Sequence, residues 1–340
     1  MERKCIVFTK PNTAELIQET FSPEPEAGEV LVRTVFGGIS PGTERANITG
    51  NPNVAGRNAP DISFPRRCGY STAGIVEAVG NGVTTVETGD RVVAFWTKHR
   101  NIQTVPEAQV IRLPDERISL EEAALIFISV FPLAAIRKTR LELGESALVM
   151  GCGLLGQFAI RLLRISGAVP VIAADPVDSR RKEALAGGAD YALDPAAPDF
   201  AETVKRITGG GANVCIEVTG VGAGLDGALD CMARFGRVSL LGCTRDKNFS
   251  IDYYRKVHCP GITLIGAHTN ARPSAESHGG WFTHRDDIVS VMKLLEGGRL
   301  DIKSMIGGVY KPYECAEVYD RIINDRSFPT AAIFDWRDVE

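Results

Sequence analysis

The feature that most constrains the fold of this chain is a G-x-G-x-x-G motif between an apolar run and an amphipathic stretch. The pattern predicts a strand over 147–150, a tight turn, and a helix over 154–165. The first glycine permits the turn, the second leaves room for a diphosphate, and the third lets the helix pack closely on the strand. The N–H groups and the dipole at the start of that helix stabilise phosphate charge. The residues expected to bind the diphosphate are Gly151, Gly153, Leu154, Leu155 and Gly156.

A carboxylate follows the next predicted strand, which covers 169–174. Asp175 lies nineteen residues after Gly156. A carboxylate there accepts hydrogen bonds from the adenosine ribose hydroxyls and disfavours a 2′-phosphate, so we predict NAD as the cofactor rather than NADP. Arg180 and Arg181 follow closely, and the alternative that they bind a 2′-phosphate stays open. A glycine turn with a surface aspartate is the alternative that involves no cofactor.

The region 147–266 alternates short apolar runs with amphipathic stretches. Strands are expected at 147–150, 169–174, 191–193, 214–218, 238–241 and 262–265, and helices near 154–165, 179–186, 200–208 and 225–234. This alternation predicts an α/β fold with a doubly wound parallel sheet covered on both faces. Because ligands bind at the carboxyl ends of such strands, the nicotinamide half of the site is expected at Thr219, Gly220, Leu241 and Gly242.

The first ~115 residues predict a barrel-like β domain, since short β-like runs alternate with turn signals. Strands are expected at 30–35, 74–79 and 91–95, a type II turn at Pro41-Gly42, and a surface loop over Gly50–Pro65. A capping box at Ser119 and Glu122 opens a helix that Pro132 is expected to break in two. The C-terminal ~70 residues predict helices near 286–295 and 313–324 and a strand over 331–334.

Composition excludes several classes of protein. With 340 residues the chain is too long for one small core, and a formal charge of −4 lacks the basic footprint of a nucleic-acid binder. There is no 18-residue apolar run and no signal-peptide pattern, so we expect a cytoplasmic protein outside the membrane. The eight cysteines form no C-x-x-C pair. They are therefore expected to be small buried residues without disulfides or a four-cysteine zinc site.

The order of these regions resembles the medium-chain dehydrogenase/reductase superfamily, the zinc-type alcohol dehydrogenases. The motifs that carry the resemblance, besides the glycine motif, are Gly38–Ser40, Gly69–Val76, Gly89–Val92, Glu121–Ala124 and Phe235–Val238. The resemblance implies a GroES-like β-barrel domain over 1–125, a Rossmann NAD-binding domain over 126–270 and a return to the first domain over 271–340. It also implies an active site in the cleft beside the nicotinamide, and a homodimer or tetramer that pairs through the strand at 262–265.

The positions of the zinc ligands in that family are changed here. The family's cysteine position is Ser40, its His-Glu pair is Tyr70-Ser71, and its third ligand position is Phe127. Zn²⁺ prefers thiolate, imidazole or carboxylate, so we expect no zinc. The strings Ile39–Glu44, Gly69–Ser71 and Phe334–Trp336 resemble a zinc-less branch that includes bacteriochlorophyllide 3-hydroxyethyl dehydrogenases and sugar or cyclitol dehydrogenases. The relay positions of the zinc enzymes are also changed, to Gly42 and Arg45.

Without zinc, protein groups must accept the hydroxyl proton and stabilise the oxyanion. Tyr70 is the expected acid/base or oxyanion donor, with Lys98 or His99 as the cation that lowers its pKa; a packing role is the alternative. Thr43 or Glu44 is expected to contact the substrate or the nicotinamide ribose. The remaining candidates are Ser40, with turn formation as its alternative, and His268 after the last sheet strand, with a structural alternative.

We therefore expect hydride transfer between a secondary alcohol, such as a polyol, sugar, cyclitol or other cyclic alcohol, and NAD. A metal-free quinone or enoyl reductase and a non-catalytic dinucleotide-binding protein are the alternatives. An aromatic substrate wall, with core packing as its alternative, is expected from Asp252, Tyr253, Tyr254, Trp281 and Phe282. Surface or capping roles are expected for His258, His278 and His284.

Overall fold

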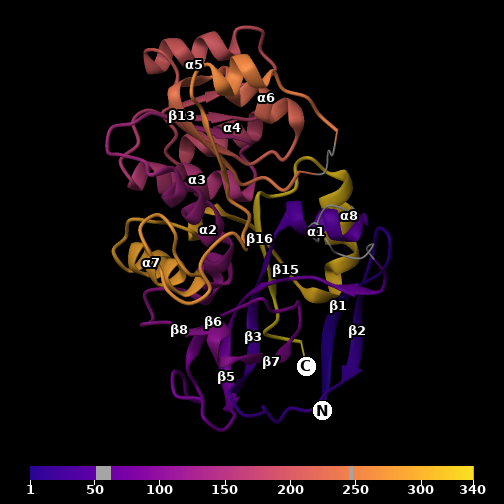
Figure 1. The fold of residues 1–340 in the computed structure, drawn as a ribbon. Coiled ribbons are helices and arrows are strands. Elements are labelled where there is room, and N and C mark those ends of the chain that lie inside the picture. Colours follow the sequence, from indigo (N-terminus) through magenta and orange to yellow (C-terminus); the bar gives the residue numbers. More distant parts are fainter. Residues whose placement is uncertain (51–62, 245–247, 340) are drawn as a thin grey trace. The chain divides into compact units, whose positions relative to one another are not determined.

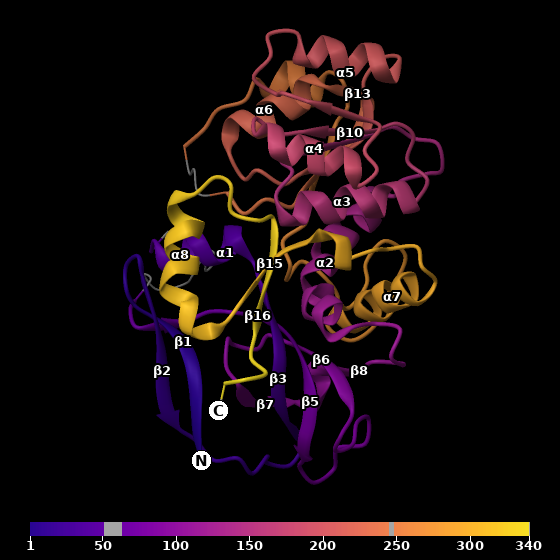
Figure 2. The same cartoon turned by 180° about the vertical axis from the view of Figure 1, so that it is seen from behind.

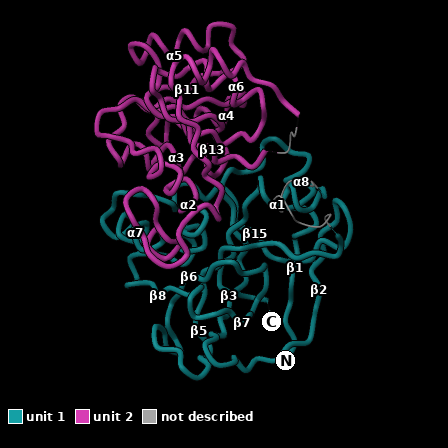
Figure 3. Tube along the Cα trace, in the orientation of Figure 1, with its two compact units in different colours: residues 1–128, 288–340 teal, residues 129–287 magenta. Residues whose placement is uncertain are grey.

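The computed structural model describes residues 1–50, 63–244 and 248–339 (Figure 1). The chain divides into two compact units, residues 1–128 with 288–340, and residues 129–287 (Figure 3). Helices α2 (Leu120–Thr139) and α7 (His284–Glu296) each contain a boundary between the units. Most of the loop predicted over Gly50–Pro65 lies outside the described residues. Among those that are described, no helix is long and apolar enough to span a bilayer.

The first unit is built on two sheets. One holds seven strands, of which six follow the order β15-β16-β3-β5-β6-β8, and β7 pairs with β3; the other has the order β2-β1-β4. The strands of the larger sheet are β3 (Glu29–Ile39), β5 (Ser71–Val79), β6 (Arg91–Phe95), β7 (Ile102–Pro106), β8 (Val110–Arg112), β15 (Ile306–Tyr310) and β16 (Ala331–Asp335). Those of the smaller sheet are β1 (Glu2–Lys10), β2 (Thr13–Thr20) and β4 (Arg66–Arg67). The predicted β domain is confirmed.

Two hydrophobic cores stabilise this unit. Alternate valines of β3 and its neighbours, such as Val30, Val32 and Val76, face one core because successive side chains of a strand point to opposite faces. The second core gathers around Tyr319, Phe334 and Trp336. It lies under helix α8 (Cys315–Asn324), which runs beside α1 (Pro41–Ile48) and β2 (Figures 1 and 2).

Two sequence predictions in this part of the chain are wrong. Pro41 begins helix α1 instead of a type II turn, because a proline at the first helical position lacks only an N–H that would be unpaired there. The capping box of Ser119 and Glu122 does open α2, with Ser119 Oγ 2.8 Å from the Glu122 carboxylate. However, α2 continues through Pro132 as a single helix. Its apolar residues are almost fully buried, and this burial offsets the roughly 3 kcal/mol that an internal proline costs.

The second unit contains the predicted parallel sheet. Its strand order is β11-β10-β9-β12-β13-β14, and every neighbouring pair is parallel. Helices α3 and α4 contact each other, as do α5 and α6, as in a doubly wound fold. The strands are β9 (Ala147–Met150), β10 (Val171–Ala174), β11 (Tyr191–Leu193), β12 (Ala212–Glu217), β13 (Met232–Leu240) and β14 (Thr263–Gly266). The helices are α3 (Leu154–Ile165), α4 (Asp178–Ala186), α5 (Phe200–Thr208) and α6 (Gly222–Asp230).

The helix predicted over 225–234 is wrong at its C-terminal end. Helix α6 ends at Asp230, and β13 begins at Met232, which pairs with Ala212 of β12. Backbone pairing in the sheet therefore overrides the helical pattern of residues 232–234. All eight cysteines are free, as predicted, and six are buried; Cys243 is partly exposed and Cys259 exposed, contrary to the expected burial.

Candidate functional site

The three glycines of the motif adopt the geometry that a diphosphate loop needs. Gly151 has φ of +97°, a left-handed conformation that favours glycine. A Cβ on Gly156 would lie 1.9 Å from the main-chain oxygen of Gly151, so only glycine permits this packing of helix on strand. A Cβ on Gly153 would meet no atom within 4 Å. The space beside Gly153 and the unpaired N–H groups of the first turn of α3 fit a diphosphate.

Asp175 is buried against this loop. Its carboxylate accepts the N–H of Cys152 on one oxygen and the N–H of Val177 on the other, both at 2.8 Å. The Arg180 guanidinium lies 3.8 Å from the same carboxylate, and Arg181 donates to the main-chain oxygen of Asp175 at 2.7 Å. The structure thus brings together the acidic residue expected to bind the ribose and both arginines that were its alternatives for a 2′-phosphate.

The carboxyl ends of β12 and β13, which carry the residues expected to line the nicotinamide half of the site, lie close to each other. The N–H groups of Leu241 and Gly242 donate to the main-chain oxygen of Glu217 at 2.9 and 2.8 Å. A Cβ on Gly242 would lie 2.4 Å from the nitrogen of Gly220, so the two strand ends pack without room for a side chain. Thr219 contacts the glycine turn of β9, since its Cγ2 is 3.1 Å from the Cβ position of Gly151.

Sequence reasoning missed Glu217. Its buried carboxylate accepts the main-chain N–H of Thr219 at 2.8 Å and also the Thr219 hydroxyl. Burial raises the pKa of Glu217, and the hydrogen bonds from Thr219 and Gly220 oppose that shift. A charged residue inside the apolar run 214–218, followed by Thr-Gly, was the available signal. Glu217 fixes the turn that carries two of the expected cofactor residues.

In the first unit, Ser40, Thr43 and Tyr70 form a hydroxyl cluster. The side chains of Ser40 and Thr43 lie close enough to the phenol of Tyr70 to lower its pKa. Ser40 is buried, Tyr70 partly exposed and Thr43 exposed, so the cluster leads from the protein interior to its surface. Three of the predicted catalytic residues are therefore neighbours.

The pKa of Tyr70 moves in the direction opposite to the expected one. Burial raises it most, the Glu44 carboxylate raises it further, and the hydrogen bonds from Ser40 and Thr43 only partly offset this. His99, the expected cation, faces Glu44 instead of the phenol. Lys98 is not among the groups that shift the pKa of Tyr70. The phenol is therefore a neutral hydrogen-bonding group at neutral pH, and the predicted role for a lysine or histidine cation is wrong.

Aromatic rings surround the phenol. The ring centroids of Trp96 and Phe127 lie 6.1 and 6.0 Å from that of Tyr70. Phe127 also stacks on Phe95 at 4.8 Å and meets Trp96 at 5.0 Å. Trp96 has φ of +58° and an exposed fraction of 37%. Sequence reasoning missed Trp96 as a neighbour of Tyr70.

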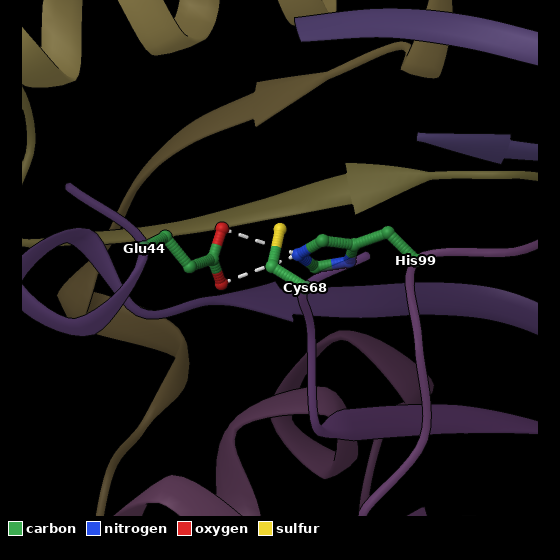
Figure 4. Close-up of side chains that lie close together, drawn as sticks. All are labelled: Glu44, Cys68 and His99. Atoms are coloured by element: carbon green, nitrogen blue, oxygen red, sulfur yellow. Dashed lines mark hydrogen bonds and ion pairs between the residues drawn. The ribbon is translucent and has the colours of Figure 1, made fainter. Parts of the chain in front are cut away.

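Glu44 is buried inside the first unit and is not exposed to a substrate. Figure 4 shows its carboxylate facing the ring of His99 beside Cys68. Its carboxylate accepts the main-chain N–H of Ser40 at 2.9 Å and the hydroxyl of Tyr319 at 2.6 Å. His99 Nε2 lies 3.2 Å from both carboxylate oxygens, and Cys68 Sγ lies 3.5 Å from the Tyr319 hydroxyl. We call Glu44, Cys68, His99 and Tyr319 the buried network.

Two sets of residues bear on whether zinc fits this unit. At the family's ligand positions stand the serine and tyrosine of the hydroxyl cluster and the buried ring of Phe127, which do not fit zinc. The buried network does contain zinc-type donors, since atoms of Glu44, Cys68 and His99 all lie within 4.8 Å of one another. Tetrahedral zinc places its ligand atoms closer, about 3.3–3.8 Å apart for bonds of about 2.0–2.3 Å. Sequence reasoning did not consider this combination.

The other predicted site residues do not gather as expected. His268 is exposed, and its Nδ1 accepts the N–H of Asn270 at 3.2 Å. The expected aromatic wall is split, because its members have different neighbours. Asp252 accepts the main-chain N–H of Arg255. Tyr253 and Tyr254 are exposed, and their rings lie beside His258. Trp281 and Phe282 instead have cations over their rings, from Lys138 and Arg137. His278 bridges to Trp281, and burial lowers the pKa of His284 to about 3.

Comparison with known proteins supports the division into two kinds of domain. Residues 26–115 match the family model of the alcohol dehydrogenase GroES-like domain, and residues 155–279 match that of the zinc-binding dehydrogenases. L-threonine 3-dehydrogenase of Pyrococcus abyssi is 30% identical over 91% of this chain and 92% of its own. D-guloside 3-dehydrogenase of Escherichia coli is 25% identical over 94% of this chain and 96% of its own.

Solved structures share the fold. An alcohol dehydrogenase of E. coli CFT073, described as short chain and complexed with NADH, has a TM-score of 0.83 at 18% identity, covering 98% of this chain and 99% of its own. The β-rich first domain is thus GroES-like, and the parallel sheet is of the Rossmann type. The chain therefore belongs to the zinc-type alcohol dehydrogenase superfamily of medium-chain dehydrogenases and reductases, and it is a nicotinamide-dependent oxidoreductase.

Proposed function

We propose that this chain transfers hydride between a secondary alcohol and NAD without zinc. The observation that carries the proposal is the hydroxyl cluster, in which Ser40 and Tyr70 stand at the family's metal-ligand positions and, with Thr43, bring three hydroxyl groups together. A hydrogen-bonding hydroxyl cluster supplies what the reaction needs from the protein, a donor for the substrate oxygen and an exit for its proton.

The second unit supplies the residues that would hold the nicotinamide dinucleotide. The diphosphate would lie at Gly153 and the first turn of α3, and Asp175 would accept a ribose hydroxyl. When bound, the cofactor supplies the nicotinamide ring that accepts or donates hydride. Asp175 favours NAD because a buried carboxylate repels a 2′-phosphate, although Arg180 lies beside it.

Tyr70 would bond to the oxygen of the substrate. Because its pKa is raised, the phenol keeps its proton at neutral pH and donates a hydrogen bond to a carbonyl or to the developing oxyanion. In the oxidation direction, the phenol accepts the alcohol proton while passing its own proton to the hydroxyl of Thr43, which gives up its proton in turn. Thr43 is exposed, so the proton leaves to water from there. No charged intermediate of the tyrosine is needed.

The surroundings of Tyr70 favour an alcohol with both a polar and an apolar face. The hydroxyl cluster offers several hydrogen bonds, and the exposed edge of Trp96 offers an apolar surface. Sugars and cyclitols present such faces, and one relative is named a guloside 3-dehydrogenase. We therefore propose a polyol, sugar or other cyclic secondary alcohol as the substrate class.

A spectrophotometric screen for NADH formation tests this function. The panel holds a D-guloside, myo-inositol, other sugars, L-threonine, 2,3-butanediol and simple primary alcohols, each with NAD⁺ and with NADP⁺. We expect turnover of a cyclic or polyhydroxylated secondary alcohol with NAD⁺. Reduction of quinones or enones by NADPH, with no alcohol oxidised, would instead support the metal-free reductase. Tight NADH binding without any turnover would support the non-catalytic alternative.

A further inference from the structure

The buried network has no part in the function proposed above, yet it contacts the hydroxyl cluster directly. We propose that Glu44, with its partners Tyr319 and His99, is a positioning residue that fixes Ser40 beside Tyr70. This inference rests on the proposed function, because it assigns the network a role in that reaction. The network lies wholly within the first unit, and its residues are fully buried or nearly so.

The carboxylate of Glu44 accepts hydrogen bonds from three sides. An ionised carboxylate only accepts hydrogen bonds, and it faces the N–H of Ser40, the hydroxyl of Tyr319 and Nε2 of His99. Such charge-assisted bonds are stronger than neutral ones. Loss of one donor leaves a buried acceptor less well satisfied, which is unfavourable. The three donors therefore hold the carboxylate in one place.

Glu44 also holds the start of helix α1. Ser40 is the N-cap residue of α1, but its side chain makes no capping hydrogen bond. Glu44, in the first turn of the helix, instead reaches back to the main-chain N–H of Ser40. Glu44 thus holds the backbone of Ser40, and the hydroxyl carried by that backbone lies near the phenol of Tyr70.

The partners of Glu44 are themselves held in place by packing and hydrogen bonds. The ring of Tyr319 packs edge-on against Phe8 at 4.8 Å, and that of His99 packs against Phe334 at 5.2 Å. The main-chain N–H of His99 also donates to the main-chain oxygen of Cys68 at 3.0 Å. Helix α8 and the segment after β6 thus place two donors at fixed positions around the carboxylate.

The network positions the cluster and does not carry protons to it. Its link to Ser40 is a main-chain N–H, which does not ionise at working pH, so no proton passes from Glu44 to Tyr70 by that bond. Removing one donor should therefore lower kcat by loosening Ser40. It should leave NADH binding, which belongs to the second unit, unchanged.

The test compares Tyr319→Phe with Tyr310→Phe. Both variants remove one buried or partly buried phenol hydroxyl near the same core, but the Tyr310 hydroxyl accepts from Arg321 and not from the network. For Tyr319→Phe we expect kcat to fall at least about tenfold and amide hydrogen exchange to quicken in the peptide covering residues 40–48, with the Kd for NADH unchanged. For Tyr310→Phe we expect none of these changes.

A second pair keeps the inference testable if Tyr319→Phe does not fold. His99→Gln keeps an N–H donor toward Glu44, and His99→Met does not. We expect the glutamine variant to retain more of the wild-type kcat than the methionine variant. Equal loss in both would show that only packing matters and would overturn the inference.

The remaining outcomes are separable from failure of the proposed function. Equal exchange of residues 40–48 in the two tyrosine variants overturns the positioning role, whatever the substrate. Faster exchange in Tyr319→Phe alone, in a protein that oxidises no alcohol, supports the positioning role and contradicts only the proposed function. Elemental analysis tests whether the buried network instead binds zinc. One zinc per chain in the wild type that is lost in Cys68→Ala would make the network a metal site and overturn the inference.

Discussion

Tyr70 is the residue on which the chemistry proposed here depends. Its phenol sits between a buried serine and an exposed threonine, and burial raises its pKa. These surroundings suit a neutral group that hydrogen-bonds to a substrate oxygen, and they do not suit a phenolate base. We therefore expect removal of the phenol oxygen of Tyr70 to lower the rate of the reaction.

Tyr70→Phe should lower kcat by about 10²-fold, the lower end of what a positioned acid or base contributes. Ring packing against Trp96 and Phe127 is retained, so folding should be unaffected. Steady-state kinetics and NADH titration measure the two effects, and the exposed Tyr313→Phe is the matched control. Unchanged turnover in Tyr70→Phe would remove the phenol from the mechanism.

The raised pKa of Tyr70 also predicts a pH dependence. An unfolded tyrosine loses its proton near pH ~10, whereas the folded state holds the Tyr70 proton to higher pH. Above pH ~10 the folded state therefore binds more protons than the unfolded state, and this contribution to stability is lost as the pH rises. The kcat profile of the wild type should show no Tyr70 ionisation between pH ~6 and ~9. A Tyr70-dependent step there, absent in Tyr70→Phe, would contradict the assignment.

Asp175→Ala should relax the preference for NAD over NADP. The substitution removes the carboxylate that repels a 2′-phosphate and leaves Arg180 beside the site. The ratio of the Kd values for NADH and NADPH measures the effect. Asp178→Ala, which removes an exposed carboxylate at the start of α4, is the control and should leave the ratio unchanged. A ratio that is equally unchanged in Asp175→Ala would exclude Asp175 as the determinant.

At the scale of residues, the sequence supported those contacts that family motifs bring together and missed those made by distant segments. Ser40, Thr43 and Tyr70 are neighbours, as the two motifs indicated. The hydrogen bond of Glu44 to Tyr319 joins residues 275 positions apart, so no local pattern shows it. Without that partner, the sequence alone predicts that Glu44 contacts the substrate or the nicotinamide ribose, whereas the side chain is buried.

At the scale of elements, the parallel sheet could be predicted closely because its strands are short, apolar and separated by glycine signals. Helix α1 and the unbroken α2 could not. Pro41-Gly42 favours a turn, but Pro41 takes the first position of α1, where a proline is tolerated. Pro132 favours a break, and the burial of the apolar residues of α2 overrides it. Local propensity is a weak constraint where an element is almost fully buried.

The glycine motif allows two of its positions to be distinguished. Gly156→Ala places a Cβ 1.9 Å from the Gly151 oxygen, so it should lower both thermal stability and NADH affinity. Gly153→Ala meets no protein atom within 4 Å, so it should fold with wild-type stability and lose only affinity, because its methyl group enters the diphosphate space. Calorimetry and NADH titration separate the two variants. Wild-type affinity in Gly153→Ala would contradict the diphosphate site.

At the scale of the whole molecule, β14 lies at the end of the Rossmann sheet, and 37% of Leu264 is exposed on it. An apolar edge strand is a template for pairing with another chain, and we propose that two copies pair there. Leu264→Lys should then shift the chain toward the monomer in light scattering after gel filtration. Leu143→Lys, at another highly exposed leucine, should not. A wild type that is monomeric at micromolar concentration would contradict this assembly.

We propose that hydroxyl groups of the first unit, and not a metal, activate the oxygen of the alcohol substrate in this protein. Turnover of the best alcohol from the screen, measured on protein stripped by a strong chelator and assayed for zinc by elemental analysis, tests it most directly. We expect the stripped protein to contain far less than one zinc per chain and to have the same kcat as untreated protein. Activity that vanishes on stripping and returns with one equivalent of Zn²⁺ would contradict it.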